Sequence, residues 1–537
     1  MTDPVTGRKT VCILTAGQGT RMGDGLAWMN KALLPLGEHA VISTLIEAFG
    51  EGSRFVIGLG HKGEQVRAYL GLAHPDADFT FVDVVPWRGE GSGPGRSLLC
   101  CRDAIGADVP FFFAPCDAVL DPGVDLDHGG DWVGVAEVSE DLSARYCNFE
   151  IESDRVVSVA DKRRVSPQRH RAFTGVMRVG SPEPFWAGLG GADRVAGEEQ
   201  VSGGLSELVR LGRLRARPLS WTDVGEEVSY RRELERRTGF DFSKPGEALY
   251  ILNQRVIKMF DDERLARGRV DRATSAPGVF PPMIEAPPGF VAYAFVDGQT
   301  LYQCIDRVLL GRLLSWASEA LWRQVDVDRG EFTRVCDGFY REKTLGRVRM
   351  LEASGALDRE PPRVHGRRVP GVRALLERID WELLSGGGTP VVFHGDLQFD
   401  NVLLRKDGSF MLLDWRQDFA GWTHAGDLDY DLAKLIGGIR MDYARIKQGE
   451  LSHSTDGDDA LFQVPSCADA ELLEDDVVAF ASAFGRDPDR LRLLVSLIHL
   501  NMAPLHAEPF RSLLRDAARA ELAEALDLVD STGERAA

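Results

Sequence analysis

The sequence has no long hydrophobic run. No segment approaches the roughly 18 consecutive apolar residues of a membrane span, and the amino-terminal stretch MTDPVTGRKTVCILTAG lacks the apolar core of a secretion signal. Cysteine is scarce: the 8 cysteines among 537 residues show neither metal-ligand spacing nor the density of a disulfide scaffold. These absences predict a soluble cytoplasmic protein with reduced thiols and no membrane partner.

Basic residues are in deficit. The chain has 63 Lys and Arg against 82 Asp and Glu, which gives a formal net charge of −19. Such a field repels nucleic acid, and the arginines are scattered rather than gathered in one run. The charge therefore predicts small-molecule partners and no nucleic acid, and it leaves a homo-oligomer open.

The hydrophobic pattern divides the chain into two parts. Up to about residue 230, short β-branched or aromatic runs alternate with helical patterns, which predicts βαβ units and a doubly wound, mostly parallel sheet. A charged connection containing Pro245 and Gly246 follows, and beyond it two strand-like stretches lead into long amphipathic helices. We expect domains at residues 1–238 and 239–537. The polar stretch at residues 437–462 is expected to be a mobile loop between helices.

A glycine-rich loop follows the first predicted strand, in LTAGQGTRMGDGLAWMNKALLPL at residues 14–36. A turn of this kind lets backbone N–H groups approach phosphate oxygens. The loop lacks the third glycine of a dinucleotide-binding fingerprint, and no GK[ST] follows to make a P-loop. What remains is a G-x-G-T-R-M motif followed by Lys31, whose charge, with that of Arg21, can neutralise phosphates. Their structural alternatives are a solvated turn residue and a surface cation at a helix start.

This motif resembles the nucleotidyltransferases that activate sugar phosphates and phosphocholine, which have Rossmann-like α/β domains. The resemblance implies a triphosphate loop, a nucleobase loop in GEGSGPGRSL at residues 89–98, two magnesium-binding aspartates and an acceptor pocket. Taken alone, the second loop is an ordinary turn, the first aspartate a helix cap and the acceptor lysine a surface residue. The residues implied are Arg21 and Lys31 for catalysis, Gly17, Gln18, Gly19, Thr20, Gly91, Ser92 and Gly93 for the nucleotide, Lys162 and Glu199 for the acceptor, and Asp117 and Asp223 for Mg²⁺.

The stretch VVFHGDLQFDNVLLRKDGSFMLLDWRQDF, residues 391–419, is the most specific signal in the chain. An aspartate, an asparagine five residues later and a second aspartate after a hairpin match the base and the two metal ligands of phosphoryl transfer. These residues are Asp396, Asn401 and Asp414. The alternative, a helix-capping HGD turn, does not explain all three. His394 is predicted to hold the loop.

The second motif resembles the aminoglycoside phosphotransferase and choline kinase relatives, over roughly residues 245–530. The resemblance implies a bilobal protein kinase-like α+β domain in which Asp396 is the base, Asn401 and Asp414 bind Mg²⁺, and a lysine holds the ATP phosphates. Lys258, in RVIKMF, is the candidate, with Glu285 as a possible partner. No glycine-rich loop precedes it; Asn253 and Gln254 form a plain hairpin turn.

Together the two resemblances imply a bifunctional enzyme. One half uses ATP to phosphorylate a hydroxyl of a small sugar or alcohol, and the other couples the phosphomonoester to a second NTP, CTP or UTP, releasing pyrophosphate. Such products supply surface polysaccharides or secondary metabolites. The alternatives are a choline or ethanolamine kinase fused to a phosphocholine cytidylyltransferase, or a one-site enzyme with a regulatory pseudokinase half. Trp415, Trp422 and Tyr430 are candidates for an aromatic box around a quaternary ammonium, although aromatic residues near an active loop more often pack within the fold. Arg416 is instead a candidate for binding an anionic substrate.

Overall fold

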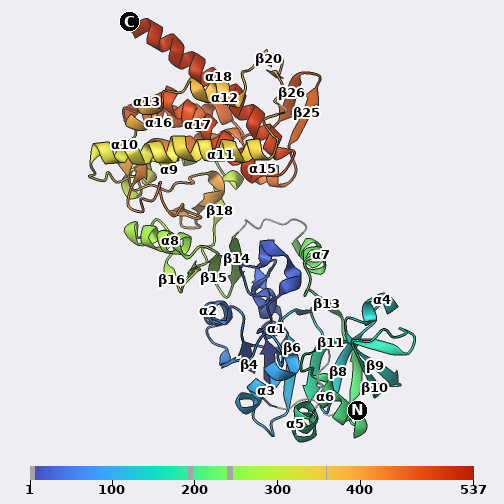
Figure 1. Cartoon of the computed structure of the whole chain (residues 1–537). Helices are drawn as coiled ribbons and strands as arrows, with labels where there is room; N and C mark the ends of the chain where they lie inside the picture. Colours follow the sequence, from blue (N-terminus) through green and yellow to red (C-terminus); the bar gives the residue numbers. More distant parts are fainter. Residues whose placement is uncertain (1–6, 192–196, 239–245, 359, 537) are drawn as a thin grey trace. The chain divides into compact units, whose positions relative to one another are not determined.

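The computed structural model describes residues 7–191, 197–238, 246–358 and 360–536. The chain forms two compact units (Figure 1), one made of Met1–Glu263 with Ile284–Tyr293 and the other of Arg264–Met283 with Ala294–Ala537. Within the described ranges, every helix is too short or too polar to cross a bilayer.

A nine-stranded sheet forms the centre of the first unit, in the order β5-β4-β1-β6-β11-β8-β12-β10-β9. The strands are β1 (Thr10–Leu14), β4 (Arg54–Leu59), β5 (Asp78–Asp83), β6 (Phe111–Pro115), β8 (Trp132–Ala136), β9 (Cys147–Glu152), β10 (Arg155–Asp161), β11 (His170–Val179) and β12 (Arg215–Pro218). The run β5-β4-β1-β6 is parallel throughout. From β11 onward antiparallel pairs dominate, and only β8 with β12 is parallel. The prediction of a mostly parallel sheet therefore holds for the first half of the sheet and is wrong for the second.

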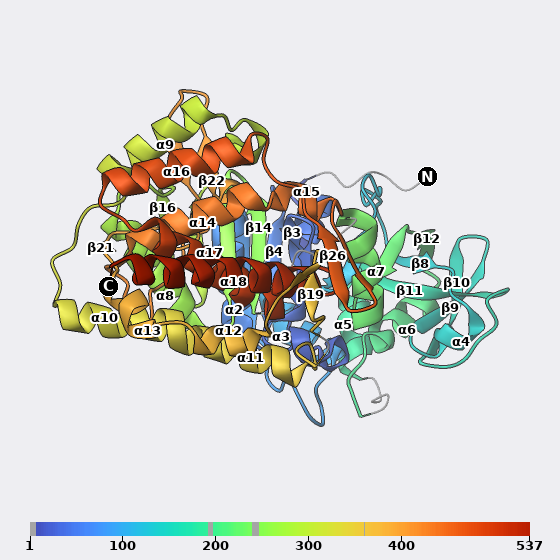
Figure 2. The ribbon, with the colours of Figure 1, turned by 90° about the horizontal axis from the view of Figure 1, so that it is seen from above.

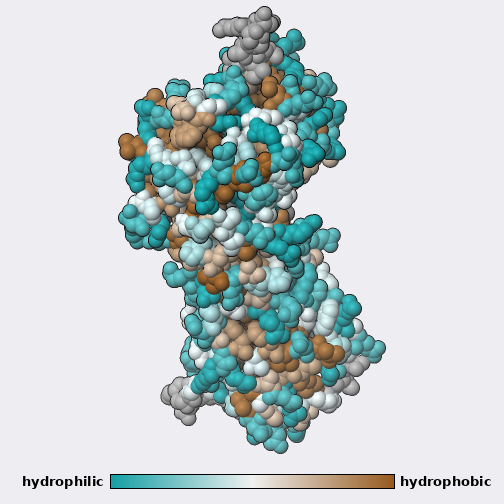
Figure 3. Space-filling model, turned by 90° about the vertical axis from the view of Figure 1, so that its left-hand side faces the viewer, coloured by the Kyte–Doolittle hydropathy of each residue, from teal (hydrophilic) through white to brown (hydrophobic). Residues whose placement is uncertain are grey.

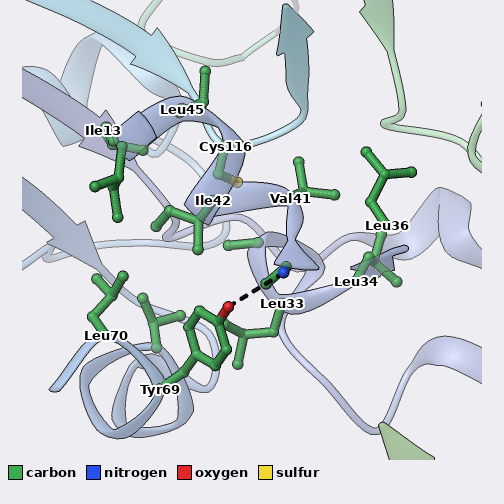
Figure 4. Packing of buried hydrophobic residues seen from close by; sticks show 14 of the residues in the cluster. Ile13, Leu33, Leu34, Leu36, Val41, Ile42, Leu45, Tyr69, Leu70 and Cys116 are labelled. Atoms are coloured by element: carbon green, nitrogen blue, oxygen red, sulfur yellow. Dashed lines mark hydrogen bonds between the residues drawn. The ribbon is translucent and has the colours of Figure 1, made fainter. Parts of the chain in front are cut away.

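Helices cover both faces of this sheet. Strand β1 shows why: Val11 and Ile13 belong to one buried cluster, and Cys12 and Leu14 to the other, because successive side chains point to opposite faces. The first cluster packs against α1 (Val41–Phe49) and α2 (Gly63–Ala73), as Figure 4 shows for Val41, Ile42 and Leu70. The second packs against α3 (Pro94–Ile105), α5 (Pro182–Gly190) and α6 (Ser202–Arg210).

Short elements complete the first unit around this sandwich. Strand β7 (Ala118–Leu120), directly after β6, pairs with β13 (Trp221–Asp223), so the two predicted magnesium aspartates lie at the ends of neighbouring segments. The others are η1 (Thr20–Met22), η2 (Asp24–Leu26), η3 (Lys31–Leu33), β2 (Pro35–Leu36), β3 (His39–Ala40), α4 (Glu140–Ser143) and α7 (Glu227–Thr238).

A second sheet packs onto the same unit, in the order β14-β15-β17-β16. Its strands are β14 (Glu247–Leu252), β15 (Arg255–Phe260), β16 (Met283–Glu285) and β17 (Phe290–Ala294). The ring of Tyr250, fully buried, lies 4.7 Å from that of Tyr69 on α2, and its hydroxyl donates to the backbone oxygen of Leu33. Compact packing of the first unit therefore extends beyond residue 238.

The second unit is mainly helical. Helix α14 lies at its centre: every residue from Leu428 to Ile439 is buried. Helix α17 packs against both α14 and α18, and Figure 2 shows these helices side by side. The helices are α8 (Glu263–Ser275), α9 (Arg307–Ala320), α10 (Arg329–Asp337), α11 (Lys343–Ala353), α12 (Val372–Glu377), α13 (Trp381–Gly386), α14 (Leu428–Arg440), α15 (Tyr443–Lys447), α16 (Ala470–Ala483), α17 (Pro488–Met502) and α18 (Phe510–Ala536), with a π-helical turn η5 (Gly338–Glu342) and 3₁₀ turns η4 (Leu301–Gln303), η6 (Phe399–Asn401) and η7 (Ala503–Leu505).

Short strands connect these helices. Strands β18 (Gln299–Thr300), β22 (Val402–Leu404) and β23 (Phe410–Leu412) form one sheet, and β21 (Pro390–Val391) pairs with β24 (Gly426–Asp427). The expectation of a mobile loop at residues 437–462 is wrong. That stretch ends α14, forms α15 and continues into the hairpin of β25 (Ser452–Asp456) and β26 (Asp459–Gln463), which joins β19 (Arg363–Val364) and β20 (Arg367–Arg368) in a sheet. Hairpin pairing satisfies its backbone groups despite its polar side chains.

The face drawn in Figure 3 is mostly polar, with apolar side chains in separate patches. Exposed apolar residues of the chain include Val228 on α7, Val308 on α9 and Leu383 on α13. Isolated apolar residues of this kind are normal on protein surfaces.

Candidate functional sites

The first site lies where strand order reverses in the amino-terminal sheet. Strands β1 and β6 are neighbours, and in doubly wound sheets such a switch point opens a crevice at the carboxyl ends of the strands. A pocket of about 700 Å³ occurs there. It is lined by Gly17, Gln18, Gly19, Thr20, Arg21, Lys31, Ser92, Gly93 and Asp117 among the predicted residues, together with Trp87, Arg88, Glu198 and Gly225.

Local packing places Lys31 in this pocket. Gly19 adopts a left-handed conformation, with φ of +66°, and a side chain there would lie 3.5 Å from Lys31 Cβ. Asn30 caps η3 by accepting from the N–H of Ala32, and its amide donates to the backbone oxygens of Thr15 and His61. The glycine loop and the start of η3 are thus fixed to each other.

Lys31 and Asp117 form an ion pair with a separation of 2.6 Å between Nζ and Oδ2. Burial acts to raise the pKa of the Asp117 carboxyl, but the Lys31 ammonium outweighs it and holds that pKa below its ordinary value; Arg21 acts in the same direction. Burial acts to lower the pKa of Lys31, but Asp117 outweighs this effect and holds that pKa above its ordinary value. The pocket therefore presents a fixed cation beside a fixed carboxylate at neutral pH.

Asp223 converges on Asp117 across Gly225. A Cβ at Gly225 would lie 2.8 Å from Asp117 Oδ2 and 2.9 Å from Asp223 Oδ1, so only glycine leaves room between the two carboxylates. Asp223 accepts from the Gly225 N–H at 2.8 Å and from the Tyr146 hydroxyl at 3.0 Å. Asp117 and Gly225 line this wall of the pocket, and Asp223 adjoins it through Gly225.

Two arginines meet at Glu226, directly after this wall. Arg145 lies 2.5 Å and Arg21 3.4 Å from Glu226 Oε1. The predicted Arg21 therefore lines the pocket while sharing a carboxylate with Arg145. Sequence reasoning missed Arg145, Tyr146 and Glu226, and the one available signal was the position of Glu226 three residues after Asp223.

The loop at residues 89–98 closes another side of the pocket. Gly93 has φ of +124°, and a Cβ there would lie 2.6 Å from the backbone oxygen of Glu199. The Gly95 N–H donates to Glu199 O and the Glu199 N–H to Ser92 O, so the two segments are tied by backbone hydrogen bonds. Of the predicted residues here, Ser92 and Gly93 line the pocket, whereas Gly91 and Glu199 support the loop behind it. Lys162 Nζ lies 3.3 Å from Glu198 Oε2, and Glu198 lines the pocket.

The second site is built around the HGD segment of the carboxyl-terminal unit. Asp431, in the first turn of α14, accepts hydrogen bonds from the N–H groups of His394 and Gly395, both at 2.7 Å, and from the Trp322 indole at 3.0 Å. Burial raises the pKa of Asp431 to about 6. Asp427 caps the same helix by accepting from the Asp429 N–H. Asp431 and Asp427 therefore hold the HGD segment and the start of α14 in place.

His394 fixes the loop in a neutral form. Its Nδ1 accepts from the Asp396 N–H at 3.1 Å, and its Nε2 lies 2.8 Å from the Leu413 carbonyl oxygen, which can only accept. Nε2 must therefore carry the proton. Burial lowers the pKa of His394 to about 4, in agreement with this arrangement.

Asp396 is paired with a lysine that the sequence analysis missed. Lys434 Nζ, on α14, lies 2.7 Å from Asp396 Oδ1, and the Asn401 amide donates to the backbone oxygen of Asp396 at 2.8 Å. Burial acts to raise the pKa of Asp396, but Lys434 outweighs it and holds that pKa below its ordinary value. A lone lysine within the apolar run LAKLIGGI was the available signal, because a buried lysine needs a partner.

Asp414 follows β23 in a left-handed conformation, with φ of +53°. Its carboxylate accepts from Arg269 on α8 at 2.9 Å, and its charge acts to raise the pKa of Asp396, so the two aspartates are near each other. Backbone pairing of the Leu413 N–H with Asn401 O brings the third predicted residue to the same place. The structure thus assembles Asp396, Asn401 and Asp414.

Lys258 lies on β15, as predicted, and the two-residue turn at Asn253 and Gln254 precedes it. The carboxylate beside it belongs to Glu247 on β14, at 3.2 Å, whereas Glu285 is exposed on β16. Lys258 therefore pairs with Glu247 rather than with the suggested Glu285. No sequence motif marks Glu247, which lies at the start of the neighbouring strand.

Comparison with known proteins matches the two halves of the chain to two different family models. Residues 11–127 match the model of the MobA-like NTP transferase domain, and residues 268–494 match that of the phosphotransferase enzyme family, APH. The chain joins an NTP transferase domain to an APH phosphotransferase domain. It is therefore a transferase of both types. The first match includes the glycine loop, Lys31 and Asp117; the second includes Asp396, Asn401, Asp414 and Lys434, but not Lys258.

Solved structures resemble the NTP transferase half. A UDP-glucose pyrophosphorylase complexed with UDP-glucose is 16% identical, with a TM-score of 0.38, over 43% of this chain and 98% of its own. A UDP-glucose pyrophosphorylase from Acinetobacter baumanii is 13% identical, with a TM-score of 0.36, over 43% of this chain and 93% of its own. No curated protein matches the chain.

Both domains contain oxygen donors suited to Mg²⁺. Within the described ranges, no group of three or more His, Cys, Asp and Glu side chains is arranged to hold a metal unaided. Mg²⁺ is usually bound by one or two carboxylates together with water and substrate phosphate oxygens. The paired carboxylates of Asp117 and Asp223, and the Asp414 carboxylate with the Asn401 amide, fit that requirement.

Proposed function

We propose that the phosphotransferase domain phosphorylates a hydroxyl of a small sugar or alcohol with ATP, and that the NTP transferase domain then couples the phosphomonoester to a second NTP, CTP or UTP. The functional division is proposed at residues 238 and 239. Both reactions consume nucleoside triphosphates, so we place them in the cytoplasm. The product is an NDP-activated compound of the kind that supplies surface polysaccharides or secondary metabolites.

One observation carries this proposal: each domain holds an aspartate in contact with a lysine that the fold largely encloses, next to the glycine-rich loop in one domain and in the HGD loop in the other. The pairs are Lys31 with Asp117 at 2.6 Å and Lys434 with Asp396 at 2.7 Å. Phosphoryl and nucleotidyl transfer depend mainly on positioning and on stabilising charge, and fixed ion pairs of this kind supply both.

In the phosphotransferase domain, the acceptor oxygen attacks the γ-phosphorus, the bond to the β-γ bridging oxygen breaks, and ADP leaves. Asp396 takes the hydroxyl proton, since its lowered pKa keeps it ionised. Asn401 and Asp414 would hold Mg²⁺, which neutralises phosphate charge, and Lys258 would contact the ATP phosphates.

In the NTP transferase domain, an oxygen of the phosphomonoester attacks the α-phosphorus and pyrophosphate leaves. Lys31 and Arg21 stabilise the phosphates, and the loop residues Gly17, Gln18, Gly19 and Thr20 wrap them. Ser92 and Gly93, supported by Gly91, would contact the base. Asp117 and Asp223 would bind Mg²⁺, and Lys162 and Glu199 would border the acceptor.

The test separates the two activities. Asp396→Asn should lower ADP release about 10²–10⁴-fold, the usual contribution of a general base, and leave pyrophosphate release from a supplied phosphomonoester unchanged. Asp117→Asn should do the reverse. Both are read with ATP, CTP, UTP, GTP and dTTP against phosphorylated and free sugars and amino alcohols.

Matched controls are Asp407→Asn, on the exposed turn between β22 and β23, and Asp125→Asn, exposed in the NTP transferase domain. Loss of both activities in either active-site variant would contradict two independent sites. If none of the acceptors supported ADP release while pyrophosphate release remained intact, the phosphotransferase half would be a regulatory element.

A further inference from the structure

Three basic side chains gather beside Asp396 and have no part in the reaction described above. Lys343 and Arg347 lie one turn apart on α11, and Arg416 follows Asp414 by two residues. The N–H of Arg416 donates to the His394 carbonyl at 3.0 Å, which fixes its backbone to the HGD loop. The cluster therefore belongs to the wall of the phosphotransferase site.

The charges of this cluster act on one another. Burial lowers the pKa of Lys343 well below its ordinary value, and Arg416, Lys434 and Arg347 lower it further, whereas Asp396 acts to raise it. Burial and Arg416 likewise lower the pKa of Arg347. Geometry places two of these cations together, because Lys343 and Arg416 both lie over the ring of Phe339.

No carboxylate among the described residues forms an ion pair with Lys343, Arg347 or Arg416. Lys434 differs, because it is paired with Asp396. The Arg416 Nε atom is also buried without a hydrogen-bond partner in the described structure. Partly buried cations without a counter-ion are costly, and a bound anion removes that cost.

The neighbouring aromatic rings are already covered by these cations. Lys343 Nζ lies 4.1 Å from the centre of the Phe339 ring and 5.4 Å from that of Tyr430, and Arg416 Cζ lies 5.0 Å from the Phe339 ring centre. Phe419 stacks on Phe339 at 3.9 Å, which leaves one face for the cations. A quaternary ammonium would have to displace Lys343 and would be repelled by the whole cluster.

The three candidate residues of an aromatic box pack within the fold, the alternative that the sequence favoured. Trp415 is buried against Phe280, Trp422 stacks on His424, and Tyr430 packs against Phe339. Each ring therefore has a partner within the fold, and the surroundings of Asp396 favour negative rather than positive groups.

We propose that the acceptor of the phosphotransferase domain carries an anionic group, a carboxylate or a phosphate, which Lys343, Arg347 and Arg416 bind while its hydroxyl faces Asp396. This inference rests on the proposed function and names its substrate class: an acidic sugar or a sugar phosphate rather than choline or ethanolamine. The activated product then retains the same acidic group.

The experiment measures ADP release by the full-length protein with glucose, glucuronate, glucose 6-phosphate and choline. At least one anionic probe is expected to exceed glucose in kcat/KM by tenfold or more, and choline to be the poorest. Lys343→Gln and Arg416→Gln should each lower kcat/KM for that probe at least tenfold more than kcat/KM for glucose, a difference of about 1.4 kcal/mol, with the KM for ATP unchanged. Which anionic probe responds distinguishes carboxylate from phosphate.

Arg349→Gln is the matched control, because Arg349 is exposed on the same helix. Arg416→Lys, which keeps the charge, should restore part of the loss. Equal turnover of glucose and both anionic probes would overturn the inference, as would preference for choline. A matching rise in the KM for ATP would also overturn it, since the cluster would then bind the nucleotide.

Calorimetric titration separates failure of this inference from failure of the proposed function. The heat of binding glucose 6-phosphate or glucuronate is compared between the wild type and Arg416→Gln, which cancels binding at the NTP transferase site. A difference that persists in an Asp396→Asn background supports the anion subsite even where no probe is phosphorylated. No difference with either probe overturns it.

Discussion

Two lysines set the charge of the two aspartates on which the proposed chemistry depends. Asp117 and Asp396 are both partly buried, a setting that favours the protonated acid. Lys31 and Lys434 reverse that preference at contact distance. Because the effect is electrostatic, replacing either lysine should change the pH at which its aspartate titrates. This change should appear without a change in the fold.

Lys434→Met should shift the acid limb of the phosphotransferase pH profile upward. Lys434 lowers the pKa of Asp396, so its loss raises that pKa, and the ionised base is then lost at a higher pH as the solution is acidified. The measurement is kcat/KM for ADP release between pH 4 and 9. Lys447→Met, which removes a more exposed lysine paired with Asp400, is the control. An unchanged acid limb with lowered kcat would show that Lys434 only positions substrate.

His394 should remain neutral throughout the physiological range. Its pKa of about 4 lies below the ordinary 6.5, so its contribution to stability is complete above about pH 6.5 and is lost as the pH falls through 4. Nitrogen-15 spectra of histidine-labelled protein should show one ring with a protonated Nε2 that does not titrate between pH 5 and 8. His394→Gln identifies that signal. A ring that titrates near pH 6.5 would contradict the assigned hydrogen bonds.

At the scale of elements, the loop at residues 89–98 depends on close backbone approach. Gly93→Ala should damage nucleotide binding, because a Cβ in that left-handed conformation would lie 2.6 Å from the Glu199 oxygen and 3.0 Å from its nitrogen. We expect the KM for the NTP to rise about tenfold, the equivalent of about 1.4 kcal/mol of strain, with ADP release unchanged.

Gly25→Ala provides the comparison for this loop, since a Cβ at Gly25 meets nothing within 4 Å and its φ is not left-handed. Pyrophosphate release should be equal in Gly25→Ala and the wild type. If Gly93→Ala behaved like Gly25→Ala, segment 197–200 would be free to move away, and the loop would not be held as the hydrogen bonds indicate.

Sequence patterns predicted those parts of the fold that depend on neighbouring residues. The alternation of strand and helix gave the parallel strands β1, β4, β5 and β6, and the hairpin spacing from Asn401 to Asp414 gave β22 and β23. The resemblance to nucleotidyltransferases implied that Asp117 and Asp223 lie together, and the two carboxylates do meet across Gly225, because Asp117 follows β6 and Asp223 ends β13.

Patterns failed where distant segments decide the outcome. Lys434, Glu247 and Glu226 acquire their roles from partners on other elements, which local periodicity does not encode. The antiparallel half of the sheet depends on which strand edges meet. The hairpin of β25 and β26 was missed because its exposed side chains resemble those of a loop while its backbone pairs with β19.

At the scale of the whole molecule, the sheet of β14 and β15 ties the sequence after residue 245 to the amino-terminal core. Tyr250 is fully buried there, and Ala248, Leu252 and Ile257 join the same cluster as α1 and α2. The lysine proposed to contact ATP, Lys258, lies on this sheet. Stability of the NTP transferase core and placement of Lys258 should therefore be linked.

Tyr250→Ala should destabilise the first unit by about 3–5 kcal/mol, because it removes a buried ring and leaves a cavity beside Tyr69. For a unit of this size, the temperature at which pyrophosphate release is lost should fall by roughly 6 °C or more. Tyr250→Phe, which removes only the hydrogen bond to Leu33, should cost about 1 kcal/mol. Leu249→Ala, on the exposed side of the same strand, should cost little.

Heat inactivation of the two activities is followed in parallel. If Tyr250→Ala lowered the inactivation temperature of ADP release alone, the sheet would be energetically part of the phosphotransferase half, and its packing on α2 would contribute nothing to the NTP transferase core.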